Sequence, residues 1–195
     1  MITYIFGIDP GFTCTGISLL KSDKKRIQLV NFDTAIEPKQ NKKLTDDVRV
    51  ELMSKTVLKK LNDIMSKTQD PNFSYKFAIE TIFSNGNSKS LVMQARLFQA
   101  IECLLWQYNQ TTFSNGIEDS SVHEYHPNTV KATIYKGSCS KGAAHTAIFD
   151  KKLIPRKMLE LIDEESDVKQ EAILDAVAIA YTGIVLHWGT DNSAK

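Results

Sequence analysis

Three short apolar segments follow one another at the start of the chain, and this order restricts the fold more than any other feature of the sequence. Residues 4–9 form an apolar run that ends at the turn signal Pro10-Gly11. Residues 15–20 are again apolar, and residues 27–35 alternate between apolar and polar side chains. Runs of this length, joined by short polar turns, predict an antiparallel β-meander at the start of the fold.

Predicted helices and strands alternate through the rest of the chain. Five stretches are expected to form helices: residues 44–65, 91–108, 127–134, 141–153 and 168–188. Two runs of strand type lie between the first three of them, at residues 75–82 and 122–125. Residues 33–43 are polar, contain Pro38 and are expected to form a loop. Three consecutive strands followed by this alternation predict an α/β fold with a mixed five-stranded sheet and helices on both faces.

The composition is that of a globular protein of one domain. A chain of 195 residues with 42% hydrophobic and 24% charged residues suits one sizeable core, expected to span residues 1–188 with a tail at 189–195. No stretch reaches the roughly 18 apolar residues of a membrane helix, and residues 1–8 lack the pattern of a signal peptide. The three cysteines, which argue against a disulfide framework or a zinc site, are Cys14, Cys103 and Cys139. We therefore expect a protein that is cytoplasmic, or nucleoid-associated in a cell without organelles, and that does not bind membranes.

Charge is unevenly distributed, although the formal net charge is only +1. Residues 131–157 carry basic side chains opposed only by Asp150, whereas residues 160–175 are acidic and opposed only by Lys169. Each run alone is typical of a solvated face. Adjacent runs of opposite sign also fit a phosphate-binding patch beside a cation-binding site.

Three carboxylates end or interrupt apolar elements. Asp9 ends the first predicted strand, Glu80 ends the fourth, and Asp175 lies in the apolar final helix. In a mixed sheet the first and fourth strands can be neighbours, and ligands collect at the carboxyl ends of parallel strands. An acid in an apolar helix is costly to bury without a partner or a metal. A structural role is also open for each acid, as a turn cap for Asp9 and as an ion-pair partner for the other two.

Such a set of acids suits divalent-metal chemistry. Carboxylates are hard oxygen ligands for Mg²⁺ or Mn²⁺. Two such ions about 3.5–4 Å apart can activate a water and stabilise the leaving oxygen of a phosphodiester. His123 and His126 are not expected to bind metal, because their spacing in a strand puts them on opposite faces. His145 lies among basic residues and is a candidate phosphate contact.

At these residues the sequence resembles the RuvC family of Holliday junction resolvases. Five motifs carry the resemblance, in the family's order and over nearly the whole chain: residues 7–11 with 15–16, residues 78–80 with Phe83, residues 94–96, residues 125–141, and residues 175–180. The resemblance implies the ribonuclease H-like fold, which has the order of strands and helices predicted above. It also implies a homodimer that binds a four-way DNA junction and makes one nick in each active site.

The resemblance also implies roles for individual residues. Asp9, Glu80 and Asp175 correspond to acids that hold two Mg²⁺ ions per active site, which Mn²⁺ can replace. Lys131 and Lys141 correspond to lysines that contact or stabilise the scissile phosphate, which makes Lys141 a candidate catalytic residue. Phe83 corresponds to a residue that stacks on an unpaired base at the junction centre, a contact worth about 1–3 kcal/mol. The candidate DNA contacts are Phe83, Lys131, Lys136, Lys141 and His145.

Two departures from the family pattern concern the acids and the basic segment. The family carries a fourth acid, or a histidine, three residues before the final aspartate, and this chain has Ala172 there. Glu171 lies one helical turn before Asp175 on the same helix face, so we expect Glu171 to serve as the fourth catalytic metal ligand. The basic segment between Lys131 and Lys141 is one residue shorter than in bacterial members, which predicts a looser sequence preference. The lysine-rich, arginine-poor composition is typical of a phage or a small AT-rich genome.

Three other functions remain open at this point. A non-cleaving, structure-selective DNA-binding protein could use the same fold and basic patch. A related nuclease that trims structured RNA shares the fold and the first motif. An actin-like ATPase or sugar kinase also has the Gly-Ile-Asp-x-Gly motif, but it needs a second domain and a second phosphate motif that this chain lacks. The sequence does not identify helper motor proteins.

Overall fold

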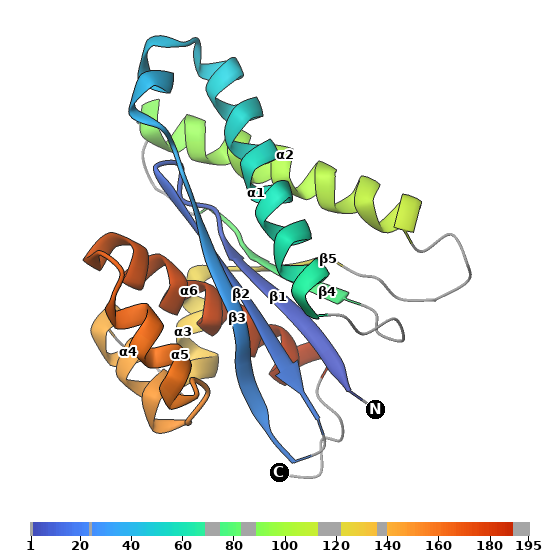
Figure 1. Ribbon diagram of the computed structural model, residues 1–195, viewed down its shortest axis with the longest axis vertical. Coiled ribbons are helices and arrows are strands. Elements are labelled where there is room, and N and C mark those ends of the chain that lie inside the picture. Colours follow the sequence, from blue (N-terminus) through green and yellow to red (C-terminus); the bar gives the residue numbers. More distant parts are fainter. Residues whose placement is uncertain are drawn as a thin grey trace.

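The computed structural model describes residues 2–23, 25–68, 75–82, 89–112, 122–135 and 140–188, with only the backbone for residues 108–112 and 141. The predicted tail at 189–195 lies outside these residues. The five strands are β1 (Thr3–Asp9), β2 (Cys14–Ser22), β3 (Ile27–Ile36), β4 (Tyr75–Glu80) and β5 (Val122–Tyr125). They form one sheet in the order β3-β2-β1-β4-β5, in which β1 to β3 are antiparallel and β1, β4 and β5 are parallel (Figure 1). The predicted mixed five-stranded sheet is confirmed.

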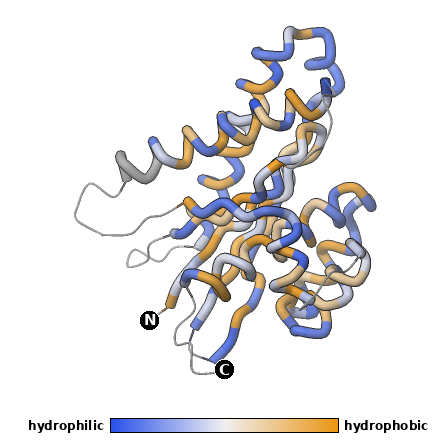
Figure 2. The backbone as a smooth tube through the Cα atoms, turned by 180° about the vertical axis from the view of Figure 1, so that it is seen from behind, coloured by the Kyte–Doolittle hydropathy of each residue, from blue (hydrophilic) through white to orange (hydrophobic). Residues whose placement is uncertain are grey.

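Helices cover both faces of this sheet (Figure 1). One face is covered by α1 (Asp46–Thr68) and α2 (Lys89–Thr112), which contact each other. The other face carries α3 (Pro127–Tyr135), α4 (Lys141–Asp150), α5 (Arg156–Asp163) and α6 (Asp167–Gly183), which continues into the π-helical η2 (Ile184–Trp188). α1 and α2 alternate hydrophobic and hydrophilic residues along their length, as helices with one buried face do (Figure 2).

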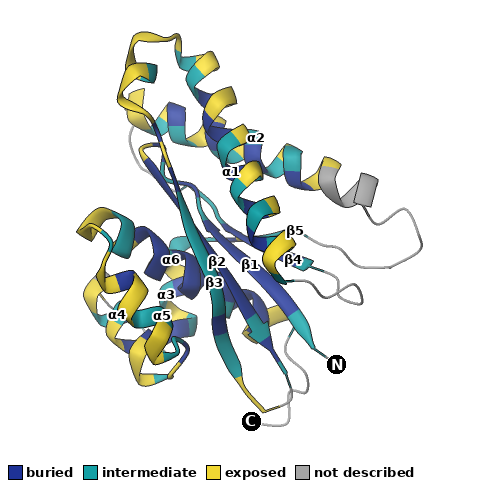
Figure 3. Ribbon diagram, in the orientation of Figure 1, coloured by how far each residue is buried: buried dark blue, intermediate teal, exposed yellow. Residues whose placement is uncertain are grey.

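The two faces of the sheet carry separate clusters of buried side chains. Along β1, Phe6 and Ile8 pack with α1 and α2, whereas Ile5 packs with α6 and its neighbours. The same alternation places Phe77 and Ile79 of β4 on the α1–α2 side. Buried residues therefore fill the central strands and α6, while exposed residues lie on the outer sides of the helices (Figure 3).

Helix α6 with η2 has the length and hydropathy of a membrane span, but 61% of its most apolar window is buried inside the fold. It contacts β1, β2, β4, α3 and α4, so its apolar sequence is explained by its position in the core. Asp175 divides the apolar sequence of this helix, so no uninterrupted apolar run reaches the length of a membrane span.

Several predicted boundaries were wrong. β3 continues to Ile36 and is followed by a 3-10 helix, η1 (Lys39–Lys43), within the predicted loop. The helix predicted to end at residue 153 ends at Asp150, because Lys152 adopts a left-handed backbone with φ 55°. Helix α5 was not predicted, since no element was assigned to residues 154–167. Its sequence holds four charged and four apolar residues, and its Ile162 is buried against the core.

Candidate metal centre

Asp9 and Glu80 end two adjacent parallel strands. In the ladder between β1 and β4, Gly7 pairs with Ala78 and Ile8 pairs with Ile79, so the two acids are the next residues on their strands. After Asp9 the chain turns sharply, with Gly11 N–H donating to the Asp9 carbonyl over 2.9 Å. The predicted neighbourhood of the first and fourth strands is confirmed, and it brings both acids to one edge of the sheet.

Both acids belong to the face of the sheet that α6 covers. Side chains alternate along a strand, and Ile8 and Ile79 belong to the opposite face. Asp9 and Glu80 are half-buried, and both line a cleft of about 150 Å³ together with turn and loop residues, Gln94 of α2 and Pro127 of α3. Two carboxylates in one solvent-connected cleft are a suitable donor pair for a hard divalent cation.

Two glycines let the backbone of α6 lie directly on the sheet. A β-carbon on Gly16 would lie 1.9 Å from the carbonyl oxygen of Ala172, and one on Gly7 would lie 2.0 Å from that of Ala176. Real side chains do not approach this closely, so only glycine fits at either position. Gly16 is also the ladder partner of Asp9. The register of α6 is therefore set so that the helical turn holding Asp175 lies between these two contacts, beside the edge that carries Asp9.

The carboxylate of Asp175 contacts a histidine from another helix. Nε2 of His145, on α4, lies 2.8 Å from Oδ1 of Asp175, and the two side chains are 16% and 22% exposed. The sequence analysis treated His145 only as a candidate phosphate contact. No local signal links the two residues, because they are 30 positions apart and on different helices.

The predicted fourth ligand lies at the edge of this arrangement. Glu171 is exposed on α6, one helical turn before Asp175, whereas Ala172 is buried against the backbone of Gly16. Among the residues that the structure describes, no three His, Cys, Asp or Glu side chains are gathered closely enough to hold a metal ion. The donor types and the shared cleft of Asp9 and Glu80 fit a divalent cation.

The negative charge of Asp9 acts on Cys14, at the start of β2. Burial and the nearby Asp9 carboxylate raise the pKa of its thiol, and Lys169 opposes this effect. Lys169 itself forms an ion pair of 2.6 Å with Glu165. Two acids of the run at residues 160–175 therefore make ion pairs on helix surfaces, since Glu160 also pairs with Arg156.

Of the basic residues predicted to contact DNA, the structure describes the side chains of Lys131 and His145. Lys131 is half-buried on α3, one helical turn after Pro127, which lines the cleft. Lys141 is the first residue of α4, one turn before His145, and its side chain lies outside the described residues. Phe83 and Lys136 also lie outside them. Their proposed contacts with DNA remain predictions.

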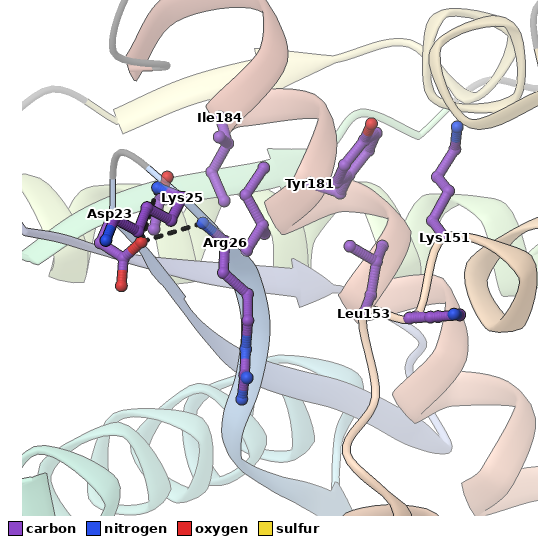
Figure 4. A pocket seen from close by; sticks show the side chains of 10 residues that line it. Asp23, Lys25, Arg26, Lys151, Leu153, Tyr181 and Ile184 are labelled. Carbon is purple, nitrogen blue, oxygen red and sulfur yellow. Dashed lines mark hydrogen bonds between the residues drawn. The ribbon is translucent and has the colours of Figure 1, made fainter.

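A larger cavity, of about 600 Å³, lies at the other end of the sheet (Figure 4). It is formed by the turn between β2 and β3 and by the connection between α4 and α5, and four of its lining residues are basic. The side chains of Arg26 and Lys151 extend in opposite directions, and Lys151 lies over the ring of Tyr181. Asp23 accepts hydrogen bonds from the turn backbone. The cations do not converge on one point, so we assign no site to this cavity.

Comparison with known proteins gives a consistent result. The family model described as crossover junction endodeoxyribonuclease RuvC matches residues 5–183. A crossover junction endodeoxyribonuclease RuvC from Syntrophomonas wolfei subsp. wolfei is 26% identical over 170 residues, which cover 87% of this chain and 86% of that protein.

Solved structures share the fold. T. thermophilus RuvC, in complex with a Holliday junction substrate, superposes with a TM-score of 0.63 at 16% identity, covering 92% of both chains. The yeast mitochondrial Holliday junction resolvase gives a TM-score of 0.64 at 11% identity, covering 92% of this chain and 78% of that one. The fowlpox virus resolvase, in complex with junction DNA, gives 0.52 at 11% identity, covering 90% and 94%. The predicted fold class is confirmed.

Proposed function

Because the chain belongs to the RuvC family of crossover junction endodeoxyribonucleases, we propose that it resolves four-way DNA junctions by metal-dependent hydrolysis of phosphodiester bonds. The observation that carries this proposal is the pairing of Asp9 and Glu80 at the ends of adjacent parallel strands, in one cleft. Helix α6, which packs directly on Gly7 and Gly16, carries Asp175, the third proposed ligand. Hydrolysis of a phosphodiester by carboxylate-held cations needs this kind of convergence.

We propose Asp9, Glu80 and Asp175 as ligands of two Mg²⁺ ions, which Mn²⁺ can replace. When bound, such ions supply an activated water and neutralise charge at the leaving oxygen. The protein contributes three carboxylates on elements whose positions are fixed by the sheet ladder and by the close contacts of α6. We retain Glu171 as the proposed fourth ligand, since it lies on α6 one turn from Asp175.

The DNA would approach over α3 and α4. Lys131 and Lys141 lie on these two helices, which both contact α6, and a positive charge fixed near the scissile phosphate stabilises the charge that develops there. Lys136, between them in the sequence, is proposed to bind the DNA backbone. Phe83 follows Glu80 by three residues and is proposed to stack on an unpaired base at the junction centre.

A homodimer is part of this proposal, and α2 offers a face for it. One stripe of the helix is exposed, while the opposite stripe packs into the core. The exposed stripe consists of Val92, Ala95, Gln99, Cys103 and Trp106. Val92 and Trp106, at its two ends, are large apolar side chains that are each 47% exposed. Two copies of this stripe packed together would place the two clefts in one assembly and allow paired nicks.

The decisive experiment compares cleavage of a synthetic four-way junction with cleavage of a matched linear duplex. Wild type, Asp9→Asn and the control Glu51→Gln are each assayed with Mg²⁺ and with EDTA. Glu51 is exposed on α1 and its carboxylate pairs with Lys55, so its loss should not alter cleavage. We expect metal-dependent paired nicks on the junction, lost in Asp9→Asn, with junction binding retained.

Two other outcomes have clear meanings. Binding without nicking in any metal would favour a non-cleaving structure-selective DNA-binding protein, a function made plausible by Ala172 in place of a fourth acid. Normal nicking by Asp9→Asn would refute the metal-centre assignment. If cleavage is observed, treatment of the free protein with a short bifunctional thiol reagent tests the dimer, since Cys103 is exposed on the α2 stripe.

A further inference from the structure

His145 is a polar partner of Asp175 that comes from another helix, whereas residue 172, on the same helix as Asp175, has no polar side chain. Ala172 has no side-chain donor or acceptor, and its carbonyl lies against the backbone of Gly16. The one other acid of α6 within a helical turn of Asp175 is Glu171, and its side chain is exposed. A polar side chain from a different helix, α4, therefore occupies the partly buried space beside the Asp175 carboxylate.

The packing of α4 fixes where the His145 imidazole lies. The helix begins at Lys141, where the Ser140 hydroxyl accepts a hydrogen bond from the backbone N–H of Ala143. Ala144, Ala147 and Ile148 are buried in the core cluster that also contains the inner face of α6. His145 projects beside this buried row and is itself 16% exposed. Its ring therefore meets Asp175 through two packed helices, which is a firmer arrangement than a contact between two surface side chains.

We propose that His145 is a positioning residue for the metal centre, on the premise that the proposed nuclease function is correct. Nε2–H donates to Oδ1 of Asp175 and fixes the plane of the carboxylate that would bind the cation. Metal-binding carboxylates are commonly held in this way, and loss of such a partner costs roughly 10- to 100-fold in metal affinity. A histidine in its neutral form donates through one ring nitrogen and leaves the negative charge of its partner intact.

The test measures metal binding without DNA, so that it does not depend on activity. Free Mn²⁺ is followed by electron paramagnetic resonance during titration of wild type, His145→Ala, His145→Gln and Asp9→Asn. Thr146→Ala is the matched control, since Thr146 is the exposed neighbour on the same helix and its hydroxyl donates to the Gly142 carbonyl. We expect His145→Ala to weaken Mn²⁺ binding by about 10- to 100-fold. His145→Gln, whose amide can place a donor near the same point, should recover most of that loss.

Cleavage kinetics give the second measurement. The Mg²⁺ concentration for half-maximal cleavage should rise in His145→Ala by a factor similar to that for Mn²⁺ binding, while the rate at saturating Mg²⁺ should approach that of wild type. A merely structural role would lower the saturated rate or the thermal midpoint and leave the metal dependence unchanged.

Three results would overturn the proposal. If His145→Ala binds Mn²⁺ as tightly as wild type while Asp9→Asn binds it weakly, His145 does not position the metal centre, and the proposed function stands. A directly bound imidazole nitrogen, detected by electron spin-echo spectroscopy of the Mn²⁺ complex and lost in His145→Ala, would make His145 a ligand instead of a positioning residue. Absence of Mn²⁺ binding in wild type, or unchanged binding in Asp9→Asn, would refute the metal centre itself.

Discussion

The close contact between Gly16 and α6 allows one prediction to be worked out in detail. In Gly16→Ala the new β-carbon would start 1.9 Å from the Ala172 carbonyl oxygen, and real β-carbons essentially never approach atoms within 3.0 Å. The atom it meets belongs to the helix backbone, so a side-chain rotation cannot relieve the contact. The helix must therefore retreat by at least about 1.1 Å at this point.

This displacement has two expected consequences. Overpacking of a tight core contact costs about 1–3 kcal/mol of unfolding free energy, or more where the obstacle is backbone. A misplacement of reacting groups by about 1 Å can cost on the order of 10²-fold in rate. Asp175 lies one turn after Ala172, so it moves with the helix. We expect Gly16→Ala to cut a junction about 100-fold more slowly and to bind it normally.

The assay combines single-turnover cleavage with urea unfolding. Gly142→Ala is the matched control, because a β-carbon there meets nothing within 4 Å. Gly142 lies in α4, where alanine is favoured over glycine by about 0.5–1 kcal/mol, so this variant should be slightly more stable and equally active. Wild-type cleavage by a Gly16→Ala protein of unchanged stability would refute either the close approach of α6 or the role of Asp175.

Further predictions concern the charges and the proposed dimer. Glu171→Gln should slow cleavage by roughly 10-fold or more because an amide is a poor metal ligand, whereas Asp167→Asn, on the same helix, should not; equal effects in the two variants would exclude Glu171 as a ligand. Lys141→Ala should slow single-turnover cleavage on the order of 10²-fold, and an unchanged rate would remove it from the catalytic set. Junction binding measured by fluorescence anisotropy should weaken steeply as salt rises, and salt-insensitive binding would contradict the basic patch. Trp106→Glu should give a monomer in analytical ultracentrifugation and unpaired nicks; a dimer with paired nicks would refute the α2 interface.

The sheet and the first two acids were predictable from the sequence for a simple physical reason. Asp9 and Glu80 each follow a short apolar run, and an acid directly after such a run must lie where the strand leaves the core. The two acids come together if the first and fourth strands are neighbours, and the pairing of Gly7 with Ala78 and of Ile8 with Ile79 shows that they are.

The contacts between helices were not predictable in the same way. His145 and Asp175 belong to separate periodic segments, and nothing within either segment reports the angle at which α4 and α6 cross. Helix α5 was missed although its apolar residues, at positions 158, 159, 161 and 162, have helical spacing, because the segment is only eight residues long. Glu171 was expected beside Asp175 from helical spacing alone, but spacing did not reveal that this residue is exposed.

The burial of α6 has a consequence for the timescales on which the acids can separate. Its residues Ala176 to Ala180 are all buried and the helix contacts all five strands, so its amide hydrogens should exchange with solvent only when the whole domain unfolds. Helix α4 is more peripheral, with Thr146, Phe149 and Asp150 exposed, and its amides should exchange through smaller openings. Asp175 would then stay in position during partial openings of the native state. Its hydrogen bond with His145 would break and re-form many times before the protein unfolds once.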